Sequence, residues 1–366
     1  MIPAEPAGIN PAARLSVVIP THNRPDLLRP CLASVTRHAP PGTEIIVVDD
    51  ASPGGAAAPV VAAFPGARLL RLARRGGFCA AANAGIRAAR HAVVELLNDD
   101  TEVTAGWAGA ALAWFADPAV AAVAPLVLCW PGGQGARIDS AGDRYYLGGV
   151  AGKRGHGERV SDAFLRPGPV FGASASSAFY RREALLRVGA LDETFGAYFE
   201  DVDLSLRLRR AGFEIVFEPG SRVLHHVSAS HGRPAAELLE QQSRNEERVF
   251  WRNLPGRAVP RALPLHAAVL AGKAWRRWRE GGLGPWLRGR LQVLREAPGL
   301  LRHRRRLRRL GPDAAPERWL VESRFWGHVW TGSQAGKDTG FPAEPAPGNL
   351  EGNRCNSCNS CNTCNS

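Results

Sequence analysis

Carboxylates follow two short apolar runs in the first hundred residues. Asp49 and Asp50 end one run, and Asn98, Asp99 and Asp100 end another. A single acidic group at such a position is most often a helix cap. If both runs are parallel strands, however, their carboxylates meet at one sheet edge and repel one another unless a cation neutralises them. A hard divalent ion such as Mg²⁺ or Mn²⁺ combines one or two carboxylates with substrate phosphates, so the pattern predicts a metal-assisted nucleoside-diphosphate site.

A third apolar run ends in Thr21, His22, Asn23 and Arg24, which adds polar groups to the same predicted edge. Two other nucleotide-binding classes are excluded by motif. No G-x-G-x-x-G follows the first run, and G-x-x-x-x-G-K-[ST] does not occur in the sequence. Dinucleotide-binding and P-loop functions are therefore not predicted.

A second acidic cluster lies in the stretch YFEDVDL at residues 198–204. It opens an amphipathic pattern that Gly212 ends. Acidic residues at a helix start interact favourably with the helix dipole, so a structural role is one interpretation. The other interpretation is a general base, because neighbouring carboxylates and aromatic rings raise the proton affinity of a carboxylate.

Alternating strand and helix patterns must position these groups. Short β-rich runs are predicted at 15–19, 44–48, 68–72 and 92–97. Helical patterns lie between them, at 26–38, 56–64 and 78–90. Strands that alternate with helices indicate βαβ units, and hence an α/β fold with a mostly parallel sheet.

Five stretches in this order resemble glycosyltransferase family 2. They are VVIPTHNRPDLLRPCLASV, EIIVVDDAS, NAGIRAA, LLNDDTEV and the long stretch from FGASASSAFY to VLHHVSAS. The last of these is particularly similar to the rhamnosyltransferase-like branch. The resemblance covers about residues 14–231. It implies the GT-A fold (a Rossmann-like, mostly parallel sheet with flanking helices), a nucleoside-diphosphate sugar as donor, and inversion at the anomeric carbon.

The resemblance also implies roles for residues at matching positions. It implies that Asp201, paired with Glu200, takes a proton from the acceptor hydroxyl. It places Asp100 at the position of a metal ligand (Mg²⁺ or Mn²⁺), with His225 near the metal or diphosphate. Asn98 stands where the family has the first acid of its D-x-D motif. The donor contacts implied are Thr21, Asn23, Arg24, Asp50, Gly77, Asn83 and Asp99.

Several residues near these motifs are predicted to be structural. His22 and His226 are interpreted as exposed or capping residues beside better candidates. Cys31 falls on the apolar face of its predicted helix, which favours a core position. The stretch Asp139-Ser140-Ala141-Gly142 and the glycine-rich sequence after it are interpreted as a loop over the acceptor side or as a plain connection.

The formal net charge of +12 is concentrated late in the chain. Residues 252–309 hold 16 Lys and Arg but 2 acids, together with several tryptophans. Arginine on one helix face with Trp and Leu on the other favours an anionic membrane surface. A solvated helical face or an oligomer contact is the main alternative. Nucleic acid is not predicted as a partner, because no recognition motif accompanies the charge.

We expect four parts: a leader (1–13), a GT-A domain (14–231), a basic helical segment (232–330), and a linker with a Cys-Asn repeat (331–366). The repeat, CNSCNSCNTCNS, has three interpretations: a thiolate metal site, an inert end, or a thiol acceptor for a peptide glycosyltransferase. The expected function is transfer to a lipid-linked or cell-envelope glycan. A non-catalytic scaffold is the alternative. Few cysteines, no visible secretory leader and no spanning segment favour the cytoplasm, or the inner face of the cell membrane.

Overall fold

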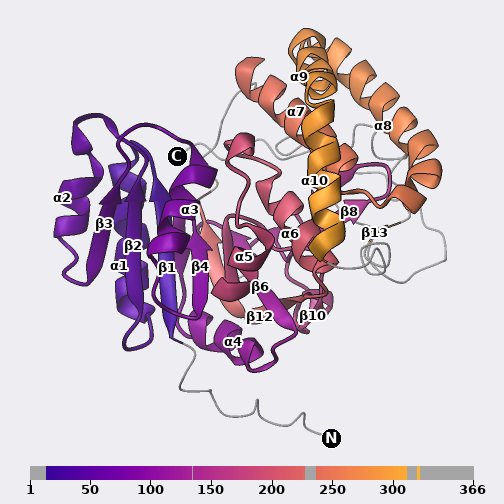
Figure 1. Ribbon diagram of the computed structural model, residues 1–366. Coiled ribbons are helices and arrows are strands. Elements are labelled where there is room, and N and C mark those ends of the chain that lie inside the picture. Colours follow the sequence, from indigo (N-terminus) through magenta and orange to yellow (C-terminus); the bar gives the residue numbers. More distant parts are fainter. Residues whose placement is uncertain (1–13, 134, 227–235, 311–319, 322–366) are drawn as a thin grey trace, which may run out of the picture.

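The computed structural model describes residues 14–133, 135–226, 236–310 and 320–321 (Figure 1). The predicted leader and the cysteine repeat lie outside these residues. The first half of the described chain alternates strands and helices, as the apolar runs predict. The strands are β1 (Leu15–Thr21), β2 (Glu44–Asp49), β3 (Ala67–Arg71), β4 (Val93–Leu97), β5 (Thr101–Val103) and β6 (Val120–Cys129). The helices are α1 (Pro25–His38), α2 (Ala57–Ala62), α3 (Phe78–Ala88) and α4 (Trp107–Ala113).

The residues after β6 add strands that are mostly antiparallel to their neighbours, and two more α-helices. They are β7 (Ile138–Ser140), β8 (Asp143–Tyr146), β9 (Val150–Lys153), β10 (Gly168–Pro169), β11 (Ser177–Arg181), α5 (Arg182–Val188), α6 (Glu200–Arg210) and β12 (Glu214–His225). The described strands build a 10-stranded sheet in the order β10-β12-β6-β11-β4-β1-β2-β3, with β5 and β7 off this path. Neighbours β4-β1-β2-β3 are parallel, and so are β12 and β6, whereas β11 runs antiparallel between β4 and β6. The predicted α/β class is confirmed.

Helices cover both faces of this sheet. Along β1, Val17 and Ile19 point to one core and Val18 to the other, which is the two-residue period of a strand. The first core also contains residues of α1, α2 and α4, including Cys31 as predicted. The second contains residues of α3, α5 and α6. Because both faces are covered, β1 is buried along its whole length, as is typical of parallel strands.

Residues 138–153 form strands where the sequence predicts a loop or a plain connection. β7 pairs with β6, and β8 pairs with β9 in a second small sheet that also includes β13 (Leu320–Val321). Strands β7, β8 and β9 are three or four residues long and are separated by glycine-containing turns, so they show no alternating pattern that the sequence alone could reveal. The Gly142 turn, at φ +90°, joins β7 to β8.

Between residues 236 and 310, the structure contains four α-helices, as the loss of strand pattern predicts. They are α7 (Ala236–Asn253), α8 (Val259–Arg279), α9 (Leu283–Arg295) and α10 (Ala297–Leu310). Figure 1 shows them gathered at one end of the sheet, where α7 and α10 contact α6. In the part of the chain that the structure describes, no helix combines the length and apolarity needed to cross a membrane.

Gly85 lets α3 lie directly on the sheet. A Cβ atom at this position would overlap Val18 and lie 3.1 Å from Val48 Cγ2. We therefore expect Gly85→Ala to lower the free energy of unfolding by about 1–3 kcal/mol, the usual cost of overpacking. Gly109→Ala in α4 is the matched control, because its Cβ would meet nothing within 4 Å. Denaturant unfolding should show that the control is unchanged or more stable by up to about 1 kcal/mol; equal losses would contradict the account.

Candidate active site

The strand-end groups predicted to meet are in contact. Thr21, at the end of β1, donates from Oγ1 to Asp99 Oδ2 at 2.7 Å. Arg24, which precedes α1, lies 3.2 Å from Asp99 Oδ1 and 3.1 Å from Asp100 Oδ2. Burial raises the pKa of Asp99 to about 6, although the charge of Arg24 and the Thr21 bond oppose this shift. Pairing across β1 and β4 thus brings two acids and a guanidinium to one edge of the sheet.

His225 reaches the same group from the end of β12. Its Nε2 atom lies 3.2 Å from Asp100 Oδ1, and its Nδ1 atom lies 3.0 Å from Asp139 Oδ2. Antiparallel pairing of His225 with Thr101 sets this position, because β5 follows Asp100 directly. Burial alone would lower the pKa of His225, but the bonds to Asp100 and Asp139 raise it to about 9.

Asp139 is a member of the site that the sequence did not identify. It is 1% exposed, and Lys153 Nζ donates to both of its oxygens at 2.9 and 3.0 Å. Burial would raise the pKa of Asp139, but Lys153 and His225 hold it well below its usual range. Because Asp139 contacts His225 Nδ1, it turns Nε2 toward Asp100. The only available signal was an acid beside a glycine turn, which is too common to be specific.

The donor set of Asp100 and His225 fits a divalent metal in part. Among the residues that the structure describes, no three His, Cys, Asp or Glu side chains are arranged to hold a metal by themselves. One carboxylate and one imidazole face each other at 3.2 Å. Mg²⁺ and similar hard ions are commonly held by one or two carboxylates, with phosphates and water completing the shell. The pair therefore fits an ion that arrives with a diphosphate.

Asp50 holds a glycine loop beside this edge. Its two carboxylate oxygens accept the backbone N–H groups of Gly76 and Gly77 at 2.6 and 2.8 Å. Gly77 has φ +81°, and a Cβ there would lie 3.2 Å from the carbonyl oxygen of Gly196. The backbone N–H of Asn23 bonds Ser52 Oγ at 2.8 Å, so the loops that follow β1 and β2 are also joined. Asp50 and Gly77 thus shape the edge of the site through the backbone.

Asn83 contacts the loop that follows α5. Its amide donates to Leu191 O at 2.8 Å and to Glu193 Oε1 at 3.0 Å, and its Oδ1 accepts from Leu191 N at 3.0 Å. Both ends of the amide are therefore engaged within the protein. These contacts support a role for Asn83 in positioning that loop.

The two histidines interpreted as exposed or capping residues have definite partners. His22 Nδ1 lies 2.8 Å from Asp50 O. His226 is half-buried, contacts Glu102 Oε1 at 2.8 Å and stacks on Trp130 with ring centroids 4.2 Å apart. Both therefore support the neighbouring groups of the site.

Glu200 and Asp201 lie at the first turn of α6, after a strained approach. Tyr198 and Phe199 have φ values of +70° and +68°, which residues other than glycine rarely adopt. Asn245 of α7 holds this approach, because its amide donates to the carbonyls of Phe195, Ala197 and Tyr198 at 2.9–3.0 Å. The helix added after the sheet thus fixes the backbone that presents the two acids.

Asp201 has a different environment from the neighbouring carboxyls of Glu200 and Asp143. Burial raises the pKa of Asp201, but the N–H groups of Ala175 and Val202 oppose the shift at 3.0 and 2.8 Å. Burial and the charge of Asp201 raise the pKa of Glu200 and of Asp143 well above the ordinary range. These two carboxyls therefore favour the neutral form, and Asp201 is the member of the group best placed to stay ionised. Asp201 is also the partly exposed one.

Asp203, two residues further along α6, is structural. It is fully buried and contacts Arg207 Nε at 2.8 Å, Arg252 Nε at 3.2 Å and Asn253 Nδ2 at 2.8 Å. Burial would raise its pKa, but the two guanidinium groups hold it well below the usual range. The acidic cluster read from the sequence thus divides into a partly exposed acid at the site and a buried anchor for α7.

Comparison with known proteins identifies a family for the first part of the chain. The sequence profile described as "Glycosyl transferase family 2" matches residues 16–189. This region of the chain belongs to glycosyl transferase family 2. The matched region holds the β1, β2 and β4 ends, but Asp201 and His225 lie beyond it.

Three relatives share the family 2 region. Protein y4gI of Sinorhizobium fredii is 33% identical over 238 residues, or 60% of this chain and 25% of the relative. A pre-mycofactocin glycosyltransferase of Mycobacterium tuberculosis is 32% identical over 232 residues, or 61% and 44%. An N-acetylglucosaminyl-diphospho-decaprenol L-rhamnosyltransferase of the same organism is 45% identical over 71 residues, or 19% and 23%. The chain thus spans less than half the length of the relatives it matches.

Two solved structures share the fold of this chain. GalNAc-T7 with UDP, GalNAc and Mn²⁺ has a TM-score of 0.54 at 20% identity, over 66% of this chain and 50% of that chain. The mannosyltransferase PcManGT of Pyrobaculum calidifontis, with GDP-Man and Mn²⁺, has a TM-score of 0.50 at 18% identity, over 81% and 84%. The predicted GT-A fold is confirmed.

Proposed function

We propose that this family 2 protein transfers a sugar from a nucleoside diphosphate to an acceptor hydroxyl, with inversion at the anomeric carbon. The observation that carries the proposal is the state of Asp201. It is partly exposed and accepts two backbone N–H groups that oppose the rise in its pKa, beside Glu200 and Asp143, whose pKa burial raises well above the ordinary range. A poised carboxylate of this kind suits a general base. Family membership supports the same chemistry, and so do the nucleotides bound in the two solved structures of this fold.

The strand-end cluster, which consists of Thr21, Arg24, Asp99, Asp100 and His225, is proposed to hold the donor. Asp100 and His225 would bind a divalent ion, which when present supplies positive charge that stabilises the leaving diphosphate. Arg24, held between Asp99 and Asp100, offers a second positive group at the same edge. The Asp50-bound glycine loop would approach the nucleotide through its backbone. Thr21, by fixing Asp99, keeps this edge in shape.

Asp201 is proposed to act on the acceptor. It takes the proton from the acceptor hydroxyl while that oxygen forms a bond to the anomeric carbon. The bond from this carbon to the diphosphate oxygen breaks in the same step, and the diphosphate leaves with the electron pair. One displacement of this kind inverts the anomeric centre. Glu200, kept neutral by burial, would donate a hydrogen bond rather than compete as a base.

The acceptor is proposed to be a lipid-linked or cell-envelope glycan, at the inner face of the cell membrane. The similarity to a rhamnosyltransferase that acts on a decaprenol-linked sugar supports this proposal, and so does the basic segment after residue 251. The rhamnosyltransferase-like resemblance points to a hexose or deoxyhexose as the transferred sugar.

Nucleotide binding tests the donor half of the proposal. Thermal melting of the full chain is measured with UDP, GDP and dTDP, each with Mn²⁺ and with a chelator. We expect at least one nucleotide to raise the melting temperature in the presence of Mn²⁺, because a ligand that binds the native state stabilises it. No shift with any nucleotide would argue for the scaffold alternative.

Asp139→Asn tests whether Asp139, through its contact with His225, contributes to metal binding. Loss of a carboxylate that orients a metal-bound histidine typically costs about 10–100-fold in metal affinity. We expect the Mn²⁺ concentration at half-maximal nucleotide binding to rise by this factor, measured by calorimetry. Asp162→Asn, on an exposed residue of the same region, is the control. Equal Mn²⁺ dependence in the two variants would contradict a role for Asp139.

A further inference from the structure

One exposed face of α8 is apolar. Leu263, Ala267, Ala271, Trp275 and Trp278 recur at intervals of three or four residues, which places them on one side of the helix. All five are exposed, with Trp275 at 52% and Trp278 at 61%. Two tryptophans this exposed are costly in water, because large aromatic side chains gain most from burial. The face is therefore expected to have a partner.

α9 continues this surface. Leu287, Leu291 and Leu294 are 43%, 58% and 71% exposed and share one side of the helix. Arg288 and Arg295 are exposed beside them. We call the five residues of α8 and these three leucines the α8–α9 face.

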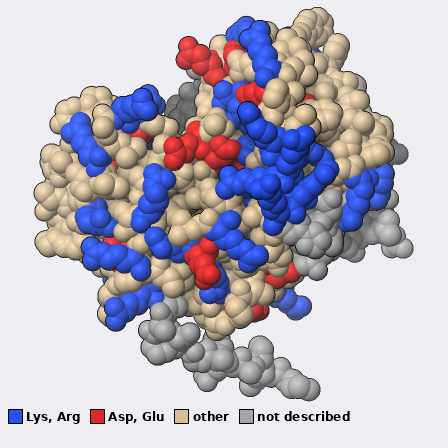
Figure 2. Space-filling model, in the orientation of Figure 1, with Lys and Arg blue, Asp and Glu red and all other residues tan. Residues whose placement is uncertain are grey.

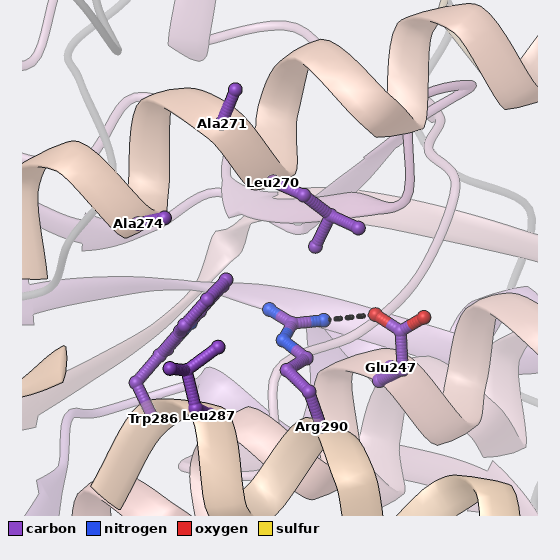
Figure 3. Close-up of a pocket in the computed structure, with 7 residues that line it drawn as sticks. All are labelled: Glu247, Leu270, Ala271, Ala274, Trp286, Leu287 and Arg290. Atoms are coloured by element: carbon purple, nitrogen blue, oxygen red, sulfur yellow. Dashed lines mark hydrogen bonds and ion pairs between the residues drawn. The ribbon is translucent and has the colours of Figure 1, made fainter. Parts of the chain in front are cut away.

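A cavity of about 350 Å³ joins the two halves of the face (Figure 3). Leu270, Ala271 and Ala274 line it from α8, and Trp286 and Leu287 line it from α9. Its remaining lining is an ion pair between Arg290 and Glu247, which Figure 3 shows at the side away from α8. Because these two charges are paired with each other, the cavity presents hydrocarbon to an incoming group.

The charge around the face is one-sided. Residues 259–295 contain eight Lys and Arg and one acid, Glu280. The neighbouring α10 exposes Arg302, Arg305 and Arg308, and Figure 2 shows basic side chains gathered over this helix. An apolar centre with tryptophan and a basic surround matches an anionic lipid surface, in which acyl chains lie beneath phosphates. Nucleic acid would leave the apolar centre uncovered.

α10 differs from what its sequence suggests. The run LLRHRRRLRRL predicts a helix with a free apolar side, but Leu307 is 3% exposed and its carbonyl accepts from Arg210 Nε at 3.0 Å. Leu310 packs against the main core. Leu301 stays 59% exposed, but the rest of the exposed surface of α10 is mostly arginine, so the larger apolar contact must come from other helices.

We propose that the α8–α9 face inserts into the interface of an anionic phospholipid bilayer, and that the cavity between the helices takes up the end of an acyl chain. This deepens the membrane association suggested under the proposed function, but it requires no sugar transfer. Helix α7 also connects the face to the active site. On α7, Glu247 borders the cavity and Asn245, two residues earlier, holds the approach to Glu200.

Flotation of the full chain with vesicles tests the proposal. The vesicles contain phosphatidylcholine alone or with about 30% phosphatidylglycerol. We compare the wild type with Trp275→Ser/Trp278→Ser and with Leu291→Ser/Leu294→Ser. The control is Leu186→Ser in α5, whose side chain is 44% exposed on another part of the surface. All replaced side chains are exposed, and melting curves check that each variant folds.

We expect wild type and control to float with the anionic vesicles, more weakly at high salt, and each double variant to lose at least about tenfold in partition. Partition of the double variants equal to the wild type would overturn the proposal. A wild type that does not float with the vesicles would also overturn it. If that wild type sediments as a dimer and the double variants sediment as monomers, the face binds a second copy of the chain instead of a membrane. Nucleotide-induced stabilisation, measured on the same samples, reports the proposed function separately.

Discussion

Replacing Asp201 by asparagine is expected to lower sugar transfer by at least about 100-fold while leaving donor binding unchanged. The amide keeps the size of the side chain but cannot accept the acceptor proton, and a general base typically contributes about 10²–10⁴-fold. Donor binding should persist because the strand-end cluster, at Asp99 and Asp100, is built from other elements. The measurement is turnover of the donor beside calorimetric nucleotide affinity.

Asp203→Asn is the matched control for this variant, two residues along the same helix. Its carboxylate is buried between Arg207 and Arg252, so its loss should cost about 3–5 kcal/mol of stability. Since the folded pKa of Asp203 is depressed, its stabilising effect is present above the unfolded pKa of about 3.9 and fades as the pH falls below it. We expect Asp201→Asn to melt like the wild type and Asp203→Asn to melt lower. Near-normal turnover in Asp201→Asn would remove it as the base.

Replacing Asp100 by asparagine is expected to raise the Kd for nucleoside diphosphate in Mn²⁺ at least about 100-fold. Loss of an outer partner of a metal ligand costs about 10–100-fold, so loss of a direct ligand should cost at least as much. Without metal, the variant and the wild type should bind nucleotide equally weakly. Calorimetry with Mn²⁺ and with a chelator gives both numbers.

Glu102→Gln provides the control for Asp100→Asn. Glu102 contacts His226 at 2.8 Å, in a carboxylate–histidine pair directly beside the pair of Asp100 and His225. The two substitutions remove the same charge from nearby positions, but Glu102 faces the histidine that the account leaves outside the metal position. An equal loss of metal-dependent affinity in both variants would point to general electrostatics and away from a ligand role for Asp100.

Local patterns predicted the part of the site that follows single strands or opens a helix. The ends of β1, β2 and β4 were visible because an apolar run followed by Asp or Thr is a contiguous signal. The same holds for Glu200 and Asp201 before the helical period of α6. Cys31 was predicted as core because its neighbours recur at helical spacing.

Contacts between distant segments could not be predicted in this way. Asp139 and His225 are 86 residues apart, and their meeting depends on β6 pairing with both β7 and β12. Asp203 belongs to the same acidic cluster as Asp201 in the sequence, and only its contact with Arg252 of α7 shows that it is structural. The α8–α9 face could not be predicted for a similar reason, because the sequence does not show that Leu307 and Leu310 of α10 are covered whereas Trp275 and Trp278 of α8 are exposed.

Release of nucleoside diphosphate from a panel of nucleotide sugars tests the central claim most directly. Wild type and Asp201→Asn are incubated with UDP-, GDP- and dTDP-linked sugars in Mn²⁺, and the free diphosphate is measured. We expect release from at least one donor by the wild type, and at least about 100-fold less release by the variant. Release at equal rates by both proteins, or from no donor by the wild type, would contradict it.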